Sequence, residues 1–285
     1  DAIVLAEHYG DSSPWLQGGE WDTIMNYDAF MEPVTWFLTG MEKHSDQYWP
    51  ELEGDVDSFW KRMTLYYSES FSAAPVCCSM NELSNHDHSR FLTRTNHRIG
   101  RVETLGSEAA DQDVDRAVFR EAVILQMTWM GSPTVYYGDE AGVCGFTDPD
   151  NRRTYPWGRE DMDLLAFHTQ AIRMRRENPA LRHGATRLMA AGRGIVAYAR
   201  FDREETLLIV VNHSGSTGKT EAEIAVEPVF AGVQEEAEME RLLLSCADGW
   251  SCENVPLTVH EGRTVVRLPE RSAAVFRYRK PVPSS

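Results

Sequence analysis

Two groups of polar residues in this chain could act on a sugar bond. Asn85-His86-Asp87 follows a short apolar run that begins at Val76. Glu7 closes a second apolar run, Ala2-Ile-Val-Leu-Ala. Two carboxylic acids on either side of a glycosidic bond, one protonated and one ionised, are the usual means of glycoside hydrolysis. Glu7 and Asp87 are therefore the candidate pair, although a polar turn would also explain the Asn-His-Asp sequence.

Both groups stand at the ends of predicted buried strands, Ala2–Glu7 and the run from Val76. A third strand is predicted within Gly131–Glu140, which leads into the charged segment Asp148–Arg153. A short strand is also expected at Thr23–Asn26. Helices are predicted at Ala29–Leu38, Asp55–Glu69, Val114–Trp129 and Met162–Asn178, the last of them ended by Pro179. Strands that alternate with helices and deliver polar residues at their carboxyl ends are typical of a (β/α) barrel, an α/β fold.

The pattern changes after Pro179. Short β-prone runs separated by turn residues follow at Thr186–Ala190, Ile195–Phe201, Thr206–Asn212, Thr264–Leu268 and Ala273–Tyr278. Strands without intervening helices predict an all-β antiparallel sandwich over residues 180–285, after a barrel domain over residues 1–179. Within this second domain, the acidic run Glu235–Glu240 is expected to be a solvated loop or a short helix.

Charge and hydrophobicity exclude two classes of partner. The chain has 285 residues, of which 42% are hydrophobic and 25% charged, and its net charge is -16. Such a charge repels nucleic-acid phosphates and fits a protein that acts on a neutral sugar, so no nucleic-acid partner is expected. No apolar run approaches the roughly 20 residues that span a bilayer, so no membrane partner is expected either.

The cysteines do not indicate a metal site. Cys77 and Cys78 are adjacent inside a predicted strand, where neighbouring side chains point to opposite faces, so both are expected to be buried. Neither Cys144 nor the pair Cys246 and Cys252 has the spacing of a zinc site. We therefore expect no metal and no other cofactor. This cysteine use favours a reducing, cytoplasmic compartment, although an export signal could lie in a part of the protein that precedes this chain.

Several of these segments resemble, in order, the later signature regions of the α-amylase family, glycoside hydrolase family 13. The segment Glu7–Tyr27 contains Ser-Pro-Trp-Leu and Met-Asn-Tyr and is similar to the neopullulanase, cyclomaltodextrinase and maltogenic amylase branch. The resemblance implies that Glu7 ends the fifth barrel strand, that Asn85-His86-Asp87 follows the seventh, and that Gly131–Glu140 holds the eighth. It thus implies the second half of a (β/α)8 TIM barrel, followed by the β-sandwich domain that the family carries after its barrel.

The resemblance also implies a role for each candidate residue. Glu7 would be the general acid and base, His86 would donate hydrogen bonds to sugar hydroxyls, and Asp87 would stabilise the oxocarbenium-like transition state. The implied substrate-binding residues are Trp15, Asn85, Asp148 and Arg152.

Each assignment has a structural alternative. Glu7 could be an ion-pair partner, and His86 could be a histidine satisfied within the fold. Asp148 and Arg152, four residues apart, could simply pair with each other. Trp15 could pack in the core instead of stacking on a glucose ring.

Part of the implied active site has no match in this chain. The family's nucleophile is an aspartate at the end of the fourth strand, in a Gly-Phe-Arg-Leu-Asp-like segment, and no such segment is found here. We therefore expect the carboxyl-terminal half of a retaining hydrolase of maltooligosaccharides, cyclodextrins or pullulan, inactive alone. Open strand edges at Ala2–Glu7 and Pro133–Tyr137 would pair with the missing half or with a second copy. A catalytically inactive α-glucan-binding module and an α-glucan transglycosylase are the alternatives.

Overall fold

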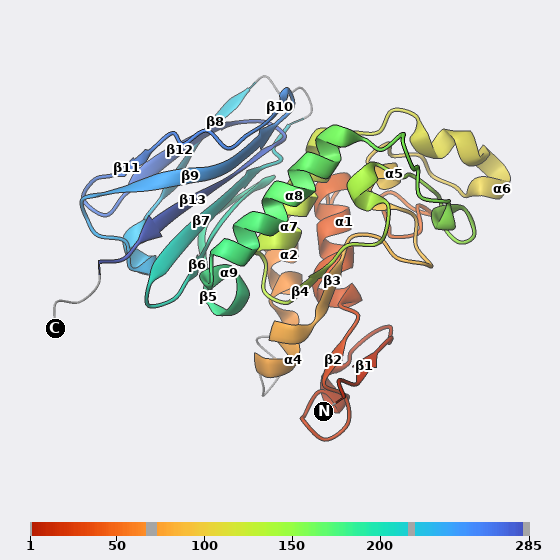
Figure 1. Ribbon diagram of the computed structural model, residues 1–285, viewed down its shortest axis with the longest axis horizontal. Coiled ribbons are helices and arrows are strands. Elements are labelled where there is room, and N and C mark those ends of the chain that lie inside the picture. The colour runs from red at the N-terminus through yellow and green to blue at the C-terminus, as the bar shows by residue number, and fades with distance from the viewer. Residues whose placement is uncertain (1, 67–72, 216–219, 282–285) are drawn as a thin grey trace. The chain divides into compact units, whose positions relative to one another are not determined.

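The chain forms two compact units. The computed structural model describes residues 2–66, 73–215 and 220–281. The first unit comprises Asp1–Gln126 and Met130–His168, and the second comprises Met127–Trp129 and Thr169–Ser285. Figure 1 labels the helices and strands of both units.

Four short parallel strands form the frame of the first unit (Figure 1). They are β1 (Leu5–Ala6), β2 (Thr23–Ile24), β3 (Met80–Glu82) and β4 (Ser132–Thr134). β1 pairs with β2, β3 pairs with β4, and a bridge from Met25 to Met80 joins the two pairs, all in the parallel sense. Parallel strands in chain order, with helices in the connections, are what one half of a (β/α) barrel requires.

The connection between β1 and β2 contains the turn η1, whereas α-helices lie between β2 and β3, between β3 and β4, and after β4. The α-helices are α1 (Glu32–Thr39), α2 (Val56–Met63), α4 (Ala73–Cys78), α5 (Phe91–Arg94), α6 (Val102–Leu105), α7 (Arg116–Thr128), α8 (Met162–Glu177) and α9 (Ala180–His183). Single helical turns lie at η1 (Ser13–Trp15), η2 (Tyr27–Met31), η3 (Ser107–Asp111), η4 (Asp139–Ala141) and η5 (Asp150–Arg152). Among the described residues, none of the helices combines the length and the apolar character that a membrane span needs.

The helices of the first unit pack through buried aromatic side chains. Phe37 of α1 stacks on Phe59 of α2 with ring centroids 4.3 Å apart, and both rings are fully buried. α2 begins where Asp55 accepts a hydrogen bond from the backbone N–H of Ser58, which satisfies one of the free donors of the first turn. α1 ends at Gly40, whose φ of 62° suits a residue without a Cβ atom.

The strand predicted from Val76 is wrong at its start. Residues Ala73–Cys78 form helix α4, and β3 begins only at Met80. Pro75 explains the difference, because it lies in the first turn of α4, where the missing backbone N–H removes no helical hydrogen bond. The β-prone residues that follow Pro75 therefore extend a helix instead of a strand.

The predicted burial of the two adjacent cysteines is wrong for the same reason. Cys77 is partly exposed and Cys78 is exposed. The prediction assumed a strand whose two faces are both buried in a sheet. In a helix, consecutive side chains point only roughly 100° apart, so both can lie toward the same exposed side. Cysteines at these positions therefore meet solvent at the surface of α4.

The predicted helices differ from the structure at their ends. The helix expected at Asp55–Glu69 is observed as α2 (Val56–Met63), and residues 67–69 lie outside the described part of the chain. Met162–Asn178 is confirmed as α8 (Met162–Glu177), but Pro179 then starts a further turn, α9, instead of ending the helical region. Proline is well suited to this place because its φ is already helical.

The second unit is an antiparallel β domain. Its strands are β5 (Ala185–Gly192), β6 (Ile195–Phe201), β7 (Glu205–Asn212), β8 (Glu221–Val226), β9 (Ala237–Cys246), β10 (Gly249–Ser251), β11 (Leu257–Val259), β12 (Thr264–Pro269) and β13 (Ser272–Arg279), with the turn η6 (Pro228–Ala231). The large sheet has the order β10-β9-β13-β7-β6-β5, with β11 also on β9, and β12 pairs with β8. Residues of both sheets share one core, including Leu208 and Ala274 of the large sheet and Ile224 and Val266 of the small one.

The acidic run Glu235–Glu240 is not a loop or a helix over its whole length. From Ala237 onward it belongs to strand β9, in which Glu238 is exposed and Met239 is fully buried. The alternation of buried and exposed positions is the ordinary pattern of a strand with one solvated face. The alternation is hard to recognise in the sequence because most residues of this run are glutamates.

The buried side chain of Asn81 joins three strand ends of the first unit. Its Oδ1 accepts a hydrogen bond from Asn26, after β2, at 2.8 Å. Its Nδ2 donates to the carbonyl of Met130, before β4, at 2.7 Å. Since Asn81 itself lies in β3 and is fully buried, both bonds replace contacts with water that these groups cannot make.

We expect the Asn81→Ala variant to lose about 2 kcal/mol of unfolding free energy, because it leaves the amide of Asn26 and the carbonyl of Met130 short of a partner in the interior. Urea unfolding followed by circular dichroism measures this loss. The control is Asn254→Ala, at an exposed position of the second unit, where a change of at most about 0.5 kcal/mol is expected. Equal losses in the two variants would contradict the role given to Asn81.

Candidate active site

Glu7 lies directly after β1, at the carboxyl end of the strand. Its Oε1 accepts a hydrogen bond from the hydroxyl of Tyr27 at 3.0 Å. Tyr27 starts the helical turn after β2 and is almost fully buried, whereas the Glu7 side chain is 41% exposed. One carboxylate oxygen is thus fixed by the protein, while the group as a whole remains accessible to a substrate.

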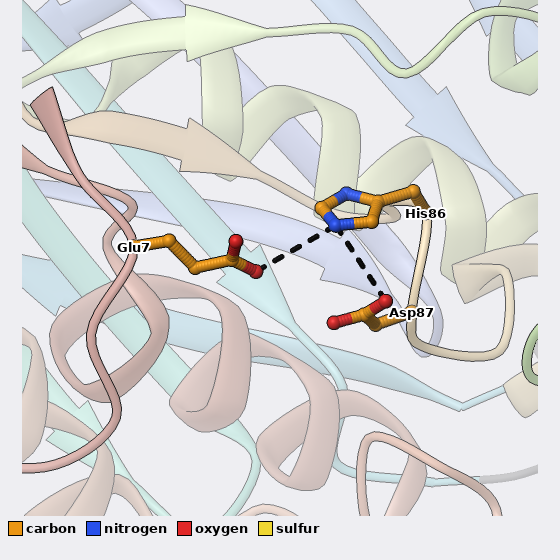
Figure 2. Close-up of side chains that lie close together, drawn as sticks. All are labelled: Glu7, His86 and Asp87. Atoms are coloured by element: carbon orange, nitrogen blue, oxygen red, sulfur yellow. Dashed lines mark ion pairs between the residues drawn. The ribbon is translucent and has the colours of Figure 1, made fainter.

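The loop after β3 brings His86 and Asp87 to Glu7 (Figure 2). Figure 2 shows the His86 ring between the two carboxylates, with Nε2 3.7 Å from Oε1 of Glu7 and 3.5 Å from Oδ1 of Asp87. All three side chains are about two fifths exposed. The structure therefore brings Glu7, after β1, to His86 and Asp87, after β3, which lie 79 and 80 positions further along the sequence.

Asn85 lies beneath this loop and is 2% exposed. Its Oδ1 accepts hydrogen bonds from the backbone N–H groups of Asp87 and His88, at 3.0 and 2.9 Å. Its Nδ2 donates to the Tyr27 hydroxyl at 3.1 Å and to Oε1 of Glu82 at 2.9 Å. In the structure, the amide of Asn85 thus holds the loop that carries the exposed site residues.

Asp148 and Arg152 form an ion pair beside Asp87. Arg152 pairs with Asp148 through Nε at 2.7 Å, and its Nη2 lies 3.9 Å from Oδ1 of Asp87. The same Nε also donates to the carbonyl of His86 at 3.1 Å. The ion pair that was the structural alternative for these two residues is therefore present, and it lies against the loop of the candidate catalytic residues.

Trp15 belongs to a small aromatic cluster beside Glu7. It stacks on Trp21 with centroids 4.9 Å apart and an interplanar angle of 22°, and the ring of His8 meets its face edge-on at 4.9 Å. Trp15 and Trp21 are both partly exposed. Partly exposed indole rings of this kind can stack on the apolar face of a sugar.

Sequence reasoning assigned no role to the second layer of the site. Tyr9 stacks on Tyr27 with centroids 4.9 Å apart, and its hydroxyl lies 3.2 Å from Nε2 of His88. Tyr27 stood in the Met-Asn-Tyr segment and His88 in the Asn-His-Asp-His segment, so both were visible as parts of motifs. Glu82 carried no such signal, because a single acidic residue in a strand is typical of a solvent-exposed face.

Burial keeps this second layer uncharged. It raises the pKa of Glu82 to about 8, with a further contribution from the nearby charges of Glu7 and Asp139, although the hydrogen bond from Asn85 acts in the opposite direction. It also raises the pKa of Tyr27, and it lowers the pKa of His88 to about 2. Glu82 is therefore mostly protonated, and His88 neutral, at pH 7.

Two groups of described residues bring three possible metal-ligand atoms within 4.8 Å of one another. The first is Glu7, His86 and Asp87, and the second is Glu42, His44 and Asp46. In the second group, Glu42 accepts hydrogen bonds from the ring and backbone of His44, and Asp46 pairs with Arg101 at 2.5 Å. These internal partners account for the arrangement, and we assign no metal to either group.

Known proteins share both the sequence and the fold of this chain. A family model for the catalytic domain of α-amylases matches residues 1–162. This chain belongs to the α-amylase family. Amylopullulanase of Thermoanaerobacter thermohydrosulfuricus is 30% identical over 97% of the chain and 18% of the relative. Neopullulanase 2 of Thermoactinomyces vulgaris is 32% identical over 75% of the chain and 32% of the relative.

Solved structures of α-amylase family members confirm the predicted fold class. The debranching enzyme of Nostoc punctiforme superimposes with a TM-score of 0.73 at 24% identity, over 96% of this chain and 51% of that one. A cyclomaltodextrinase gives a TM-score of 0.67 at 26% identity, over 96% and 40%. The chain thus forms the carboxyl-terminal part of the family's barrel and the β domain after it. It spans about half of that debranching enzyme and a third or less of these two curated relatives.

The protonation of Glu82 predicts a pH dependence of stability. Its pKa in the folded chain is about 8, above the ordinary value of 4.5, so between these values the folded state binds more protons than the unfolded state. The contribution of Glu82 to stability is therefore full below about pH 4.5 and is lost as the pH rises toward 8, by up to about 1.4 kcal/mol per pH unit. We expect Glu82→Gln, which is neutral at every pH, to remove this part of the slope.

Urea midpoints of the wild type and of Glu82→Gln, measured at intervals from pH 5 to pH 8, test this expectation. The difference between the two proteins isolates Glu82 from the other titrating groups. If the urea midpoints of the two proteins changed with pH in parallel, Glu82 would be ionised over this whole range or exposed to solvent, and the expectation would be wrong.

Proposed function

We propose that this chain carries the acid/base side of the active site of a retaining α-glucan hydrolase. Its substrates would be maltooligosaccharides, cyclodextrins or pullulan. The observation that carries the proposal is the convergence of Glu7, which follows β1, with His86 and Asp87, which follow β3: one side-chain nitrogen or oxygen atom of each lies within 4.8 Å of the others. Membership of the α-amylase family supports the substrate class, since the relatives include proteins named neopullulanase and cyclomaltodextrinase.

In this mechanism, Glu7 protonates the oxygen of the leaving sugar and later removes a proton from the attacking water. Tyr27 holds one oxygen of Glu7, which leaves the other oxygen free to carry the proton. His86 donates a hydrogen bond to a sugar hydroxyl. Asp87 places a negative charge where positive charge develops on the sugar ring.

Substrate would also contact residues on both sides of these three. The stacked pair of Trp15 and Trp21 offers an aromatic surface close after Glu7 in the chain. Asp148 and Arg152, both about half exposed, offer charged hydrogen-bonding groups beside Asp87. These positions suit an oligosaccharide that extends across the site in both directions.

We further propose that the attacking carboxylate comes from a segment outside this chain. The exposed apolar edge at β1 supports this proposal: Ile3, Val4 and Leu5 are 77%, 49% and 43% exposed. Parallel strands of a barrel are normally buried on both faces and paired on both edges. A segment that supplies the preceding barrel strands would cover these residues, and a second copy of the chain is the other candidate.

A second assignment makes Asp87 itself the nucleophile. In retaining glycosidases the acid and the attacking carboxylate lie about 5–5.5 Å apart. Oxygen atoms of Glu7 and Asp87 lie within 4.8 Å of each other, which is compatible with that separation. Under this assignment the chain alone would hydrolyse its substrate. An α-glucan transglycosylase would use the same residues, whereas a catalytically inactive binding module would bind without turnover.

We expect Glu7→Gln to lower the turnover of γ-cyclodextrin or maltotriose by about 10²–10⁴-fold in the assembled enzyme, because the amide keeps the shape of the side chain but cannot transfer the proton. Substrate affinity, measured by calorimetry, should change little. Product analysis by chromatography follows the turnover and also separates hydrolysis from transglycosylation. Wild-type turnover in this variant would remove Glu7 from the mechanism.

We expect the purified chain alone to show no hydrolysis of maltotriose, and activity to return when a fragment that supplies barrel strands one to four is refolded with it. Leu5→Asp should weaken this association, because it places a charge on the apolar edge of β1. Val265→Asp, at a comparably exposed position of the second unit, is the matched control. Hydrolysis by the chain alone that disappears in Asp87→Asn would favour Asp87 as the nucleophile instead.

A further inference from the structure

A buried carboxyl group is connected to Glu7 by a continuous series of hydrogen bonds. Glu82, the last residue of β3, is 2% exposed and accepts a hydrogen bond from Nδ2 of Asn85 at 2.9 Å. The same Nδ2 donates to the hydroxyl of Tyr27 at 3.1 Å. That hydroxyl donates to Oε1 of Glu7 at 3.0 Å.

Chemistry fixes the direction of the hydrogen bonds that Asn85 makes in this series. Oδ1 of Asn85 accepts from two backbone N–H groups, so its other end must be the NH2 group. The two hydrogens of that group go to Glu82 and to Tyr27. The hydroxyl of Tyr27 accepts from Asn85, and for its own hydrogen Oε1 of Glu7 at 3.0 Å is a stronger acceptor than Sδ of Met25 at 3.4 Å. Removal of the acceptor at Glu82 would leave one N–H of Asn85 unpaired in the interior.

The charged groups around Glu82 influence whether its carboxyl group is protonated or ionised. Glu7 and Asp139 are negative neighbours, and Asp139 is itself paired with Arg90 at 2.9 Å. Arg94 is the positive neighbour. Ionisation of Glu82 would place a second negative charge behind Glu7, across only two intervening side chains.

We propose that Glu82 is a positioning residue for the general acid: through Asn85 and Tyr27 it orients one oxygen of Glu7. The inference rests on the proposed role of Glu7. It assigns a function to a residue outside the sequence motifs that identified the site. It also predicts that ionisation of Glu82 is felt at Glu7.

NMR of the chain labelled with ¹³C at glutamate carboxyl groups tests this coupling without any measurement of activity. The Glu7 signal is assigned by its loss in Glu7→Gln. We expect the carboxyl shift of Glu7 to change a second time as the pH passes through about 8, where Glu82 ionises. In Glu82→Gln, which keeps an oxygen acceptor for Asn85, this second change should disappear while the fold is retained.

The matched control is Glu205→Gln in the second unit. Glu205 is 4% exposed, and burial raises its pKa as it does for Glu82. Glu205→Gln should leave both changes of the Glu7 signal in place. A Glu7 signal with a single change in the wild type, or with the same two changes in Glu82→Gln, would overturn the proposal.

Kinetics of the assembled enzyme test the consequence for catalysis. Glu82→Leu removes the acceptor and should lower kcat about tenfold with little change in KM, since the acid is displaced while the sugar contacts remain. Glu82→Gln should restore kcat near pH 6 and extend activity on the alkaline side. In the Tyr27→Phe variant, the additional change Glu82→Leu should not lower kcat further, because the series of hydrogen bonds to Glu7 is already interrupted.

The two proposals fail in different ways. An assembled enzyme that does not turn over α-glucans would refute the proposed function, yet would leave the NMR coupling of Glu7 and Glu82 in place. A Glu82→Leu variant with the kcat and pH profile of the wild type, in an enzyme that does hydrolyse α-glucans, would refute only the positioning role.

Discussion

The buried amide of Asn85 is the interaction on which the candidate site depends. Its two ends make four hydrogen bonds, which hold the loop of His86 and Asp87 on one side and the Tyr27 hydroxyl on the other. An unpaired amide in the interior costs about 1–3 kcal/mol, so this side chain has a single favourable orientation. The loop after β3 and the acid after β1 are thereby fixed relative to each other, although their strands are only two or three residues long.

Beneath the exposed carboxylates lies a layer that is polar but uncharged. Neutral Glu82 and His88, together with Tyr27, provide hydrogen bonds without adding formal charge. Electrostatic interactions are stronger in such surroundings than in water. In the proposed mechanism Asp87 supplies the negative charge beside the acid Glu7, which suits a reaction in which positive charge develops on the sugar ring.

The sequence predicted those features that a local pattern specifies. An apolar run that ends in polar residues marks a strand end, and the strand ends of a half-barrel meet at one face, so the approach of Glu7 to Asp87 could be expected. Helix α4 could not, because Pro75 outweighs the β-propensity of the residues after it. Glu82 was missed because its function depends on Asn85 and Tyr27, which only the tertiary structure brings to it.

A structure of the assembled enzyme carrying Glu7→Gln, with a maltooligosaccharide bound, is the most direct test of the central claim that these strand ends form the acid side of a glycosidase site. The account predicts the glycosidic oxygen at hydrogen-bond distance, about 2.6–3.2 Å, from the side chain at position 7. It also predicts sugar hydroxyls in contact with His86 and Asp87. A sugar bound elsewhere, with the loop after β3 empty, would contradict it.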